Sequence, residues 1–153
     1  YARRIYDEFK NQYRANPNVD FLVCGDFNDT PFDDAVIHDL HATGNLQAIL
    51  SLDKKQPPQF FNPSALLAEK KMATHFQSGR ENTTPLVFDQ ICLSPGLLDG
   101  TGWSYVNNSA DIVKKFEFRG RPDRFGGPND RRPWRNRGAS DHFPVTIQLR
   151  VTK

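Results

Sequence analysis

The sequence predicts an α/β (α+β) fold in which helices and strands share one core. Three observations predict this class: an amphipathic helix over residues 1–16, an apolar strand at 21–24 that passes through a polar loop into a capped helix, and a closing strand at 145–151 with alternating apolar and polar side chains. The chain has 153 residues, of which 37% are hydrophobic, so one domain with a core is expected. No apolar run approaches the roughly 18–20 residues of a membrane-spanning helix, which excludes a transmembrane segment.

The first predicted element is the helix at residues 1–16. Ile5, Phe9 and Tyr13 recur every fourth residue with basic side chains between them, which is typical of a helix with one apolar face. Asn16-Pro17-Asn18 is a stop signal.

A strand and a second helix follow. Phe21-Leu22-Val23-Cys24 is a continuous apolar run, which indicates a buried strand that Gly25 ends. Thr30-Pro31-Phe32-Asp33 indicates a helix start, with a hydroxyl N-cap, proline in the first turn and a carboxylate at the third position. This helix is expected to end by Gly44.

The rest of the chain is read from shorter patterns. Residues 46–52 are compatible with strand or helix, and 65–71 with a short helix. The apolar run 86–93 is predicted to be one strand that contains a single acid, Asp89, and 103–106 is predicted to be another strand.

Three polar clusters each interrupt an apolar element at its end: residues 25–28, Asp89, and residues 140–144. Strand ends are where ligands bind in open α/β sheets, because side chains converge there. Asp26 and Asn28, two residues apart, would point the same way in extended geometry. The alternative for this pair is a polar turn that leads into the Thr30 cap.

Asp89 requires a partner, since an unpaired carboxylate buried in an apolar strand costs several kcal/mol. A histidine or an arginine would serve, and a structural salt bridge is the alternative to a functional pair. His142 alone reads as a structural histidine. A contact with Asp89 would fix its ring, and an imidazolium suits a phosphate oxygen. Asp141 then remains for a metal, and carboxylate and amide ligands favour Mg²⁺ or Mn²⁺ over zinc.

The other histidines and the cysteines carry weaker signals. His38 and His41 have no third zinc ligand nearby in sequence and are interpreted as structural or surface residues. His75 lies in a segment that the pattern does not assign. Cys24 and Cys92 both lie in apolar runs and are predicted to be buried thiols.

Residues 114–137 carry nine basic and three acidic side chains, a net charge of +6 in a chain whose total is +2. Aromatic residues are interleaved, so this loop-like segment could hold a polyanion by phosphate pairing and stacking. The alternative is a solvated loop.

Taken in order, Gly25-Asp26-Phe27-Asn28, Asp89 in its apolar strand, and Ser140-Asp141-His142 resemble the endonuclease/exonuclease/phosphatase superfamily, the deoxyribonuclease I-like fold. The resemblance implies a four-layer fold of two packed sheets flanked by helices, of which residues 1–153 form the C-terminal half, with an Arg-rich insertion at about 114–137. Gln90 departs from the family pattern, in which an aromatic residue or histidine often stands there.

The resemblance also implies roles. Asp26 would orient or deprotonate the attacking water, Asn28 would hold that water or the phosphate, and Asp141 would belong to the metal site. His142 would stabilise charge on the scissile phosphate, with Asp89 orienting it. The family's first half supplies further ligands, an Asn and a Glu, and no candidates precede Asp26.

The predicted function is therefore hydrolysis of phosphoester bonds with Mg²⁺ or Mn²⁺, as a nuclease or phosphatase-type phosphodiesterase. The intact protein would be the enzyme, and this chain alone is expected to be inactive without the N-terminal half of the same domain. Two alternatives stay open: a phospholipid or inositol-phosphate phosphatase of the same superfamily, and a non-catalytic binding module that keeps the fold.

Overall fold

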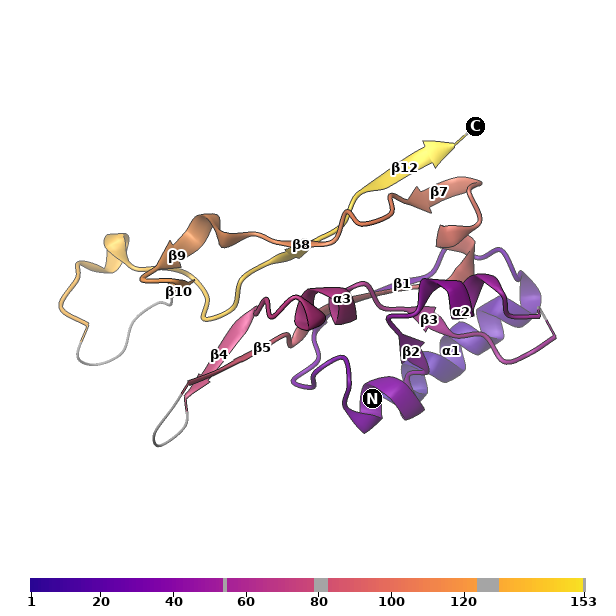
Figure 1. Cartoon of the computed structure of the whole chain (residues 1–153), viewed down its shortest axis with the longest axis horizontal. Helices are drawn as coiled ribbons and strands as arrows, with labels where there is room; N and C mark the ends of the chain where they lie inside the picture. Colours follow the sequence, from indigo (N-terminus) through magenta and orange to yellow (C-terminus); the bar gives the residue numbers. More distant parts are fainter. Residues whose placement is uncertain (54, 79–82, 124–129, 153) are drawn as a thin grey trace.

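The computed structural model describes residues 1–53, 55–78, 83–123 and 130–152 (Figure 1). The helical elements are α1 (Ala2–Ala15), the π-helix η1 (Ala35–Asp39), α2 (Leu46–Leu50), α3 (Ser64–Glu69) and the 3₁₀ turns η2 (Pro95–Leu98), η3 (Lys114–Phe116) and η4 (Trp134–Asn136). The strands are β1 (Leu22–Asp26), β2 (Ala42–Thr43), β3 (Phe60–Phe61), β4 (His75–Ser78), β5 (Thr83–Leu86), β6 (Asp89–Leu93), β7 (Gly102–Tyr105), β8 (Asp111–Ile112), β9 (Glu117–Phe118), β10 (Arg121–Pro122), β11 (Val145–Thr146) and β12 (Leu149–Thr152). None of the helices among these described residues is long and apolar enough to cross a membrane.

The central element is a mixed four-stranded sheet in the order β1-β6-β3-β2. β6 is antiparallel to both β1 and β3, and β2 is parallel to β3. The register of β1 against β6 pairs Val23 with Cys92 and places Asp26 directly opposite Asp89. Two carboxylates from distant parts of the sequence therefore face each other at one end of this strand pair. The fold class is thus mixed α/β, as predicted.

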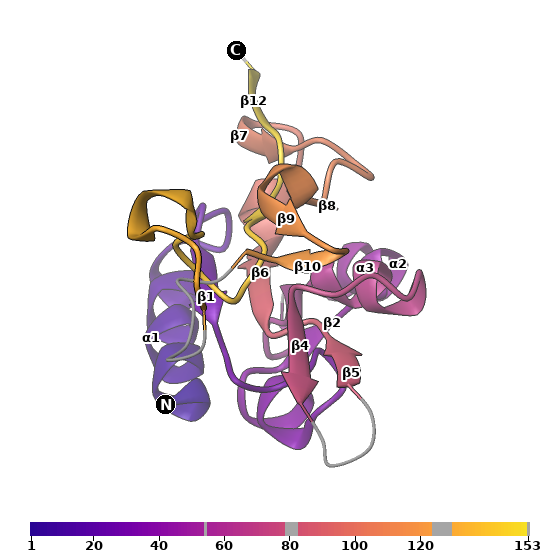
Figure 2. The same ribbon diagram turned by 90° about the vertical axis from the view of Figure 1, so that its left-hand side faces the viewer.

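Helices cover both faces of this sheet, as Figure 2 shows for α1 on one side and α2 and α3 on the other. Cys92 and Phe60 pack on the side of α1, with its buried Tyr6, Phe9 and Tyr13. The neighbouring residues Ile91, Leu93 and Phe61 pack on the opposite side, against Ile49 of α2 and Leu97 of η2. Since successive side chains of a strand point to opposite faces, burial on both sides explains why residues 91–93 of β6 are all apolar.

Cys24 departs from the sequence prediction, because its side chain is exposed while Cys92 is buried as expected. β1 lies at the end of the described sheet, and the register puts Cys24 on the same face as Ile91. The apolar cluster on that face contains residues of β3 and β6 but none of β1, which leaves Cys24 outside the cluster. Val23, on the face of α1, is partly buried.

The predicted single strand at residues 86–93 was wrong, since the chain forms β5 and β6 with a break at Val87 and Phe88. β5 pairs with β4 in a hairpin that projects away from the sheet (Figure 1), and β6 enters the sheet. The Oγ1 atom of Thr74 accepts hydrogen bonds from the backbone N–H groups of Phe88 and Asp89, at 3.0 and 3.2 Å. Asp89 therefore begins a strand rather than interrupting one.

The capped helix predicted from Thr30 is shorter than expected, because only Ala35–Asp39 is helical and Ala42–Thr43 then forms β2. The carboxylate of Asp33 accepts the backbone N–H of Thr30 at 2.6 Å, so the acid of the predicted cap is used. The Thr30 hydroxyl neither accepts nor donates a hydrogen bond among the described residues, so the predicted hydroxyl cap does not form.

Most of the remaining secondary-structure predictions agree with the structure. The helix at 1–16 and the short helix near 65–71 are confirmed as α1 and α3, the strand at 103–106 as β7, and the ambiguous segment 46–52 contains helix α2. The closing strand at 145–151 is divided into β11, which pairs with β8, and β12, which pairs with β7. Its predicted alternation holds up to Leu149, because Val145, Ile147 and Leu149 pack against the second cluster while the residues between them are exposed. The prediction was wrong for Val151, which is exposed.

Candidate active site

The centre of the site is the ring of His142, which lies between two carboxylates. Its Nδ1 atom is 2.7 Å from Oδ2 of Asp89, and its Nε2 atom is 4.0 Å from Oδ2 of Asp26. Asp26 and Asp89 are direct partners across β1 and β6, where two like charges would repel each other. A protonated imidazole at this position would offset that repulsion. The predicted contact between Asp89 and His142 is confirmed.

Thr74 holds both partners of this contact in place. Besides accepting the N–H groups of Phe88 and Asp89, this fully buried residue uses its backbone carbonyl to accept the N–H of Phe143 at 2.8 Å. The Oγ atom of Ser140 accepts the N–H of His142 at 3.0 Å. The side chains of Asp89 and His142 are only 22% and 18% exposed, so the pair is largely shielded from water.

His75 completes the surroundings of the pair, and no sequence pattern assigned it a role. It forms an isolated β-bridge with His142, and the centroids of the two rings are 4.4 Å apart. Phe88 stacks on His75 as well, with 5.6 Å between the ring centroids. The position of His75 could not be predicted from a local pattern, because the bridge pairs it with a residue that is distant in the sequence.

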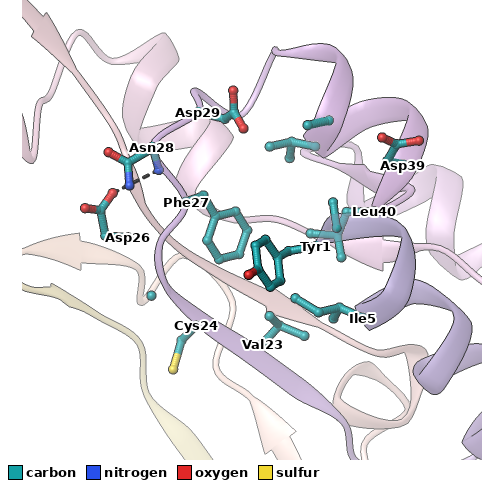
Figure 3. Close-up of a pocket in the computed structure, with 14 residues that line it drawn as sticks. Tyr1, Ile5, Val23, Cys24, Asp26, Phe27, Asn28, Asp29, Asp39 and Leu40 are labelled. Atoms are coloured by element: carbon teal, nitrogen blue, oxygen red, sulfur yellow. Dashed lines mark hydrogen bonds between the residues drawn. The ribbon is translucent and has the colours of Figure 1, made fainter.

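Asn28 lies beside Asp26 because the chain turns there, and the backbone at Asn28 is not extended. This residue has a left-handed backbone with φ of 53°, and its N–H donates to Oδ1 of Asp26 at 2.9 Å. Asn and Asp tolerate this conformation and form such local turns. The polar-turn alternative is therefore the geometry of this loop, and the extended backbone expected for the pair was wrong, although the two side chains do lie together (Figure 3).

Gln90 positions the same loop from β6. This residue is buried, donates from Nε2 to the carbonyl of Asp29 at 2.6 Å, and accepts from Nδ2 of Asn62 at 2.6 Å. The Gln90 amide donates one hydrogen bond and accepts another, so both of its buried partners are satisfied. A phenyl ring at this position could not donate a hydrogen bond to the Asp29 carbonyl. This explains how the chain accommodates Gln where the family pattern often has an aromatic residue or histidine.

A cavity of about 510 Å³ lies beside the loop after β1 (Figure 3). Phe27 points into it towards Tyr1, and Asp26 and Asn28 lie together at one end. Asp89, Asp141 and His142 do not line it. Asp26 therefore lines this cavity and also lies 4.0 Å from Nε2 of His142, so it connects the cavity with the Asp89–His142 pair.

Asp141 lies next to the two histidines rather than in the cavity. One ligand atom each of Asp141, His142 and His75 lie within 4.8 Å of one another, and Asp141 is exposed. The carboxylate of Asp26 is 4.0 Å from Nε2 of the same His142. The carboxylates of Asp141 and Asp26 offer oxygen donors, which fit a hard cation such as Mg²⁺ or Mn²⁺.

One strand of the Arg-rich segment, β10, packs beside β4. The guanidinium of Arg121 in β10 lies 5.8 Å from the ring centroid of Phe76, and β10 forms a small hairpin with β9. Residues 124–129 of the predicted insertion lie outside the described residues.

Arg132 has a structural role in this segment. It pairs with Asp123 and Asp130, each at 2.9 Å, and its hydrogen bonds lower the pKa of Asp130 to about 2. Arg131, Arg135 and Trp134 are exposed, and in the described part of the chain neither of these two arginines forms an ion pair. Arg132 is therefore engaged within the segment, whereas Arg131 and Arg135 present their charge to solvent.

A mixed α/β sheet with an Asp–His pair between strand ends is an arrangement suited to phosphate chemistry. The chain matches the model of the Endonuclease/Exonuclease/phosphatase family over residues 1–151, and it belongs to this family. Members of the family are metal-dependent phosphoesterases that act on phosphoester substrates. Searches of curated proteins and of solved structures found no significant match.

Proposed function

We propose that this protein hydrolyses phosphodiester bonds with a divalent hard cation. The observation that carries the proposal is the position of the His142 ring between Asp89 and Asp26, in a chain that belongs to a family of phosphoesterases. Phosphoryl transfer requires little covalent chemistry from side chains, so charge stabilisation and alignment dominate catalysis.

In the proposed mechanism, Asp89 accepts the Nδ1–H of His142 and fixes the ring orientation. The Nε2–H of His142 then donates to a phosphate oxygen, on which negative charge grows in the transition state. Asp26 orients the attacking water and accepts its proton, and Asn28 holds that water or the phosphate. Each role requires only groups that lie at the ends of β1 and β6 or in the loop before β11.

Asp141 is the proposed ligand of Mg²⁺ or Mn²⁺ in this chain. When bound, such a cation neutralises phosphate charge and polarises the phosphoryl oxygen. A single carboxylate is a weak site for a small, strongly hydrated ion. We therefore propose that residues 1–153 are the C-terminal portion of a four-layer family domain, whose other portion supplies an Asn and a Glu, and that the chain alone has no useful activity.

Nucleic acid is the proposed substrate, on the basis of the surface around η4. Trp134 is 76% exposed and flanked by the exposed Arg135, an arrangement that suits base stacking together with phosphate pairing. Arg132 connects this surface to the β9-β10 hairpin through Asp123 and Phe118, and β10 packs beside β4. A phospholipid or inositol-phosphate headgroup is the second candidate, and a binding module without catalysis is the third.

The proposal is tested with protein that contains the whole family domain. Duplex DNA, an inositol phosphate and a synthetic phosphodiester are each incubated with Mg²⁺ or Mn²⁺. We expect the DNA and the synthetic diester to be cleaved, and His142→Ala to lower kcat about 10²–10³-fold, as loss of one charge-stabilising donor does. His38→Ala, at an exposed histidine, is the matched control.

Cleavage of the headgroup alone would replace the nucleic-acid substrate with the second candidate. Binding of these compounds without turnover, or turnover that His142→Ala leaves intact, would overturn the proposed mechanism.

A further inference from the structure

His75, Asp141 and His142 form a cluster that the proposed hydrolysis does not fully use. One ligand atom from each lies within 4.8 Å of the others. The β-bridge between His75 and His142 brings together residues from β4 and from the loop before β11. Both histidines are partly exposed and Asp141 is exposed, so an ion from solvent can reach the cluster.

The two imidazoles are oriented in the same way. Nδ1 of His142 is 2.7 Å from a carboxylate oxygen of Asp89, and Nδ1 of His75 is 3.3 Å from the backbone carbonyl of Asp141. Each Nδ1 can therefore carry the proton that these oxygens accept. Within the described ranges, no hydrogen bond engages Nε2 of either ring. Histidines that bind metals show this pattern, in which one nitrogen donates to an oxygen and the other faces the ion.

The chemistry of the donors differs from that of a magnesium site. Two imidazole nitrogens and one carboxylate are borderline ligands that suit Zn²⁺, whereas Mg²⁺ prefers oxygen ligands and retains its waters. Asp26, 4.0 Å from Nε2 of His142, is a further carboxylate beside the cluster.

We propose that His75, His142 and Asp141 form a zinc site that discriminates against Mg²⁺, and that zinc bound there inhibits hydrolysis. Zinc would occupy the Nε2 lone pair of His142, so this nitrogen could no longer donate a hydrogen bond to a phosphate oxygen. Zinc would also take Asp141 from the hard cation. The binding step is independent of the proposed function, and only the inhibition rests on it.

The test of binding is a titration of the purified protein with Zn²⁺ against a chromophoric chelator, in the presence of excess Mg²⁺. We expect one zinc per chain at this site. His75→Phe keeps an aromatic ring beside Phe88 and removes the ligand. Loss of a residue that only hydrogen-bonds to a metal ligand weakens metal binding roughly 10–100-fold. His75→Phe removes a ligand itself and should weaken zinc binding by more than this. Asp141→Asn should weaken binding as well. His38→Ala, which removes an exposed histidine beside Asp34, should leave it unchanged.

Thermal unfolding of each variant shows whether it is folded, and Asp141→Asn decides the result if His75→Phe is not. The zinc site is overturned if the protein binds no zinc, if both folded cluster variants bind it as tightly as the native protein, or if His38→Ala weakens binding equally.

The inhibition is measured separately on hydrolytically active protein, where His75→Phe should raise the half-inhibitory zinc concentration by the same factor as it weakens binding. Equal zinc sensitivity of native protein and variant would overturn the inhibition. Absence of hydrolysis would contradict the proposed function and leave the zinc titration valid.

Discussion

The Nδ1 atom of His142 lies 2.7 Å from Oδ2 of Asp89, although 53 residues separate them. Thr74 links the two, because its hydroxyl accepts the N–H of Asp89 and its carbonyl accepts the N–H of Phe143. The geometry of the pair therefore depends on a third, buried residue that makes no contact with substrate in the proposed mechanism.

Asp89→Asn should lower kcat of the active protein about 10²–10⁴-fold, because the amide removes the negative charge that holds the ring of His142. KM should change little, since Asp89 does not touch the substrate. Steady-state kinetics on a synthetic phosphodiester measure both values. Asp34→Asn, at an exposed carboxylate, is the control. A rate equal to that of this control would mean that the pair is structural.

Thr74→Val should destabilise the protein by about 1–3 kcal/mol, because two backbone N–H groups lose their acceptor while the side-chain shape is kept. Thr74→Ser retains the hydroxyl and should be milder. Urea unfolding followed by circular dichroism measures the difference in free energy of unfolding. Equal stability of the valine and serine variants would show that the hydrogen bonds from Phe88 and Asp89 contribute nothing.

Replacing Arg131 and Arg135 together by alanine should weaken binding to duplex DNA mainly at low salt. The slope of log affinity against log salt should flatten by up to about 0.9 for each phosphate that the variant no longer neutralises. Fluorescence anisotropy over a salt series measures this slope.

Arg132→Ala is the informative comparison for that experiment. This substitution removes the ion-pair partner of Asp123 and Asp130. Its main effect should therefore be on the local structure of the segment, and its effect on the salt dependence of DNA binding should be smaller. A slope that the double variant leaves unchanged would identify the segment as a solvated loop.

The two thiols should differ in reactivity. Cys24 is exposed, whereas burial raises the pKa of the Cys92 thiol far above its ordinary value and keeps it protonated. Since the thiolate is the reactive form, iodoacetamide should modify one cysteine in the folded protein and two in guanidinium. Mass spectrometry counts the adducts. In Cys24→Ser the folded protein should remain unmodified, and labelling of Cys92 at a comparable rate would contradict the burial.

The contact of Asp89 with His142 was predictable because a carboxylate within an apolar run requires a nearby partner. Cys24 shows the limit of such reasoning, since an apolar strand predicts burial only where another layer covers that face. The turn at Asn28 and the bridge between His75 and His142 depend on a backbone angle and on a long-range pairing. Neither leaves a periodic pattern in the sequence.

The stack formed by His75 and Phe88 beside His142 has a spectroscopic consequence. Protons held over the face of an aromatic ring are shielded by its ring current, so the carbon-bound protons of His142 should resonate upfield of those of the exposed His38. Any ligand that tilts the ring of His75 away would move this resonance. The site thus contains its own reporter, which NMR can follow without a substrate and without a label.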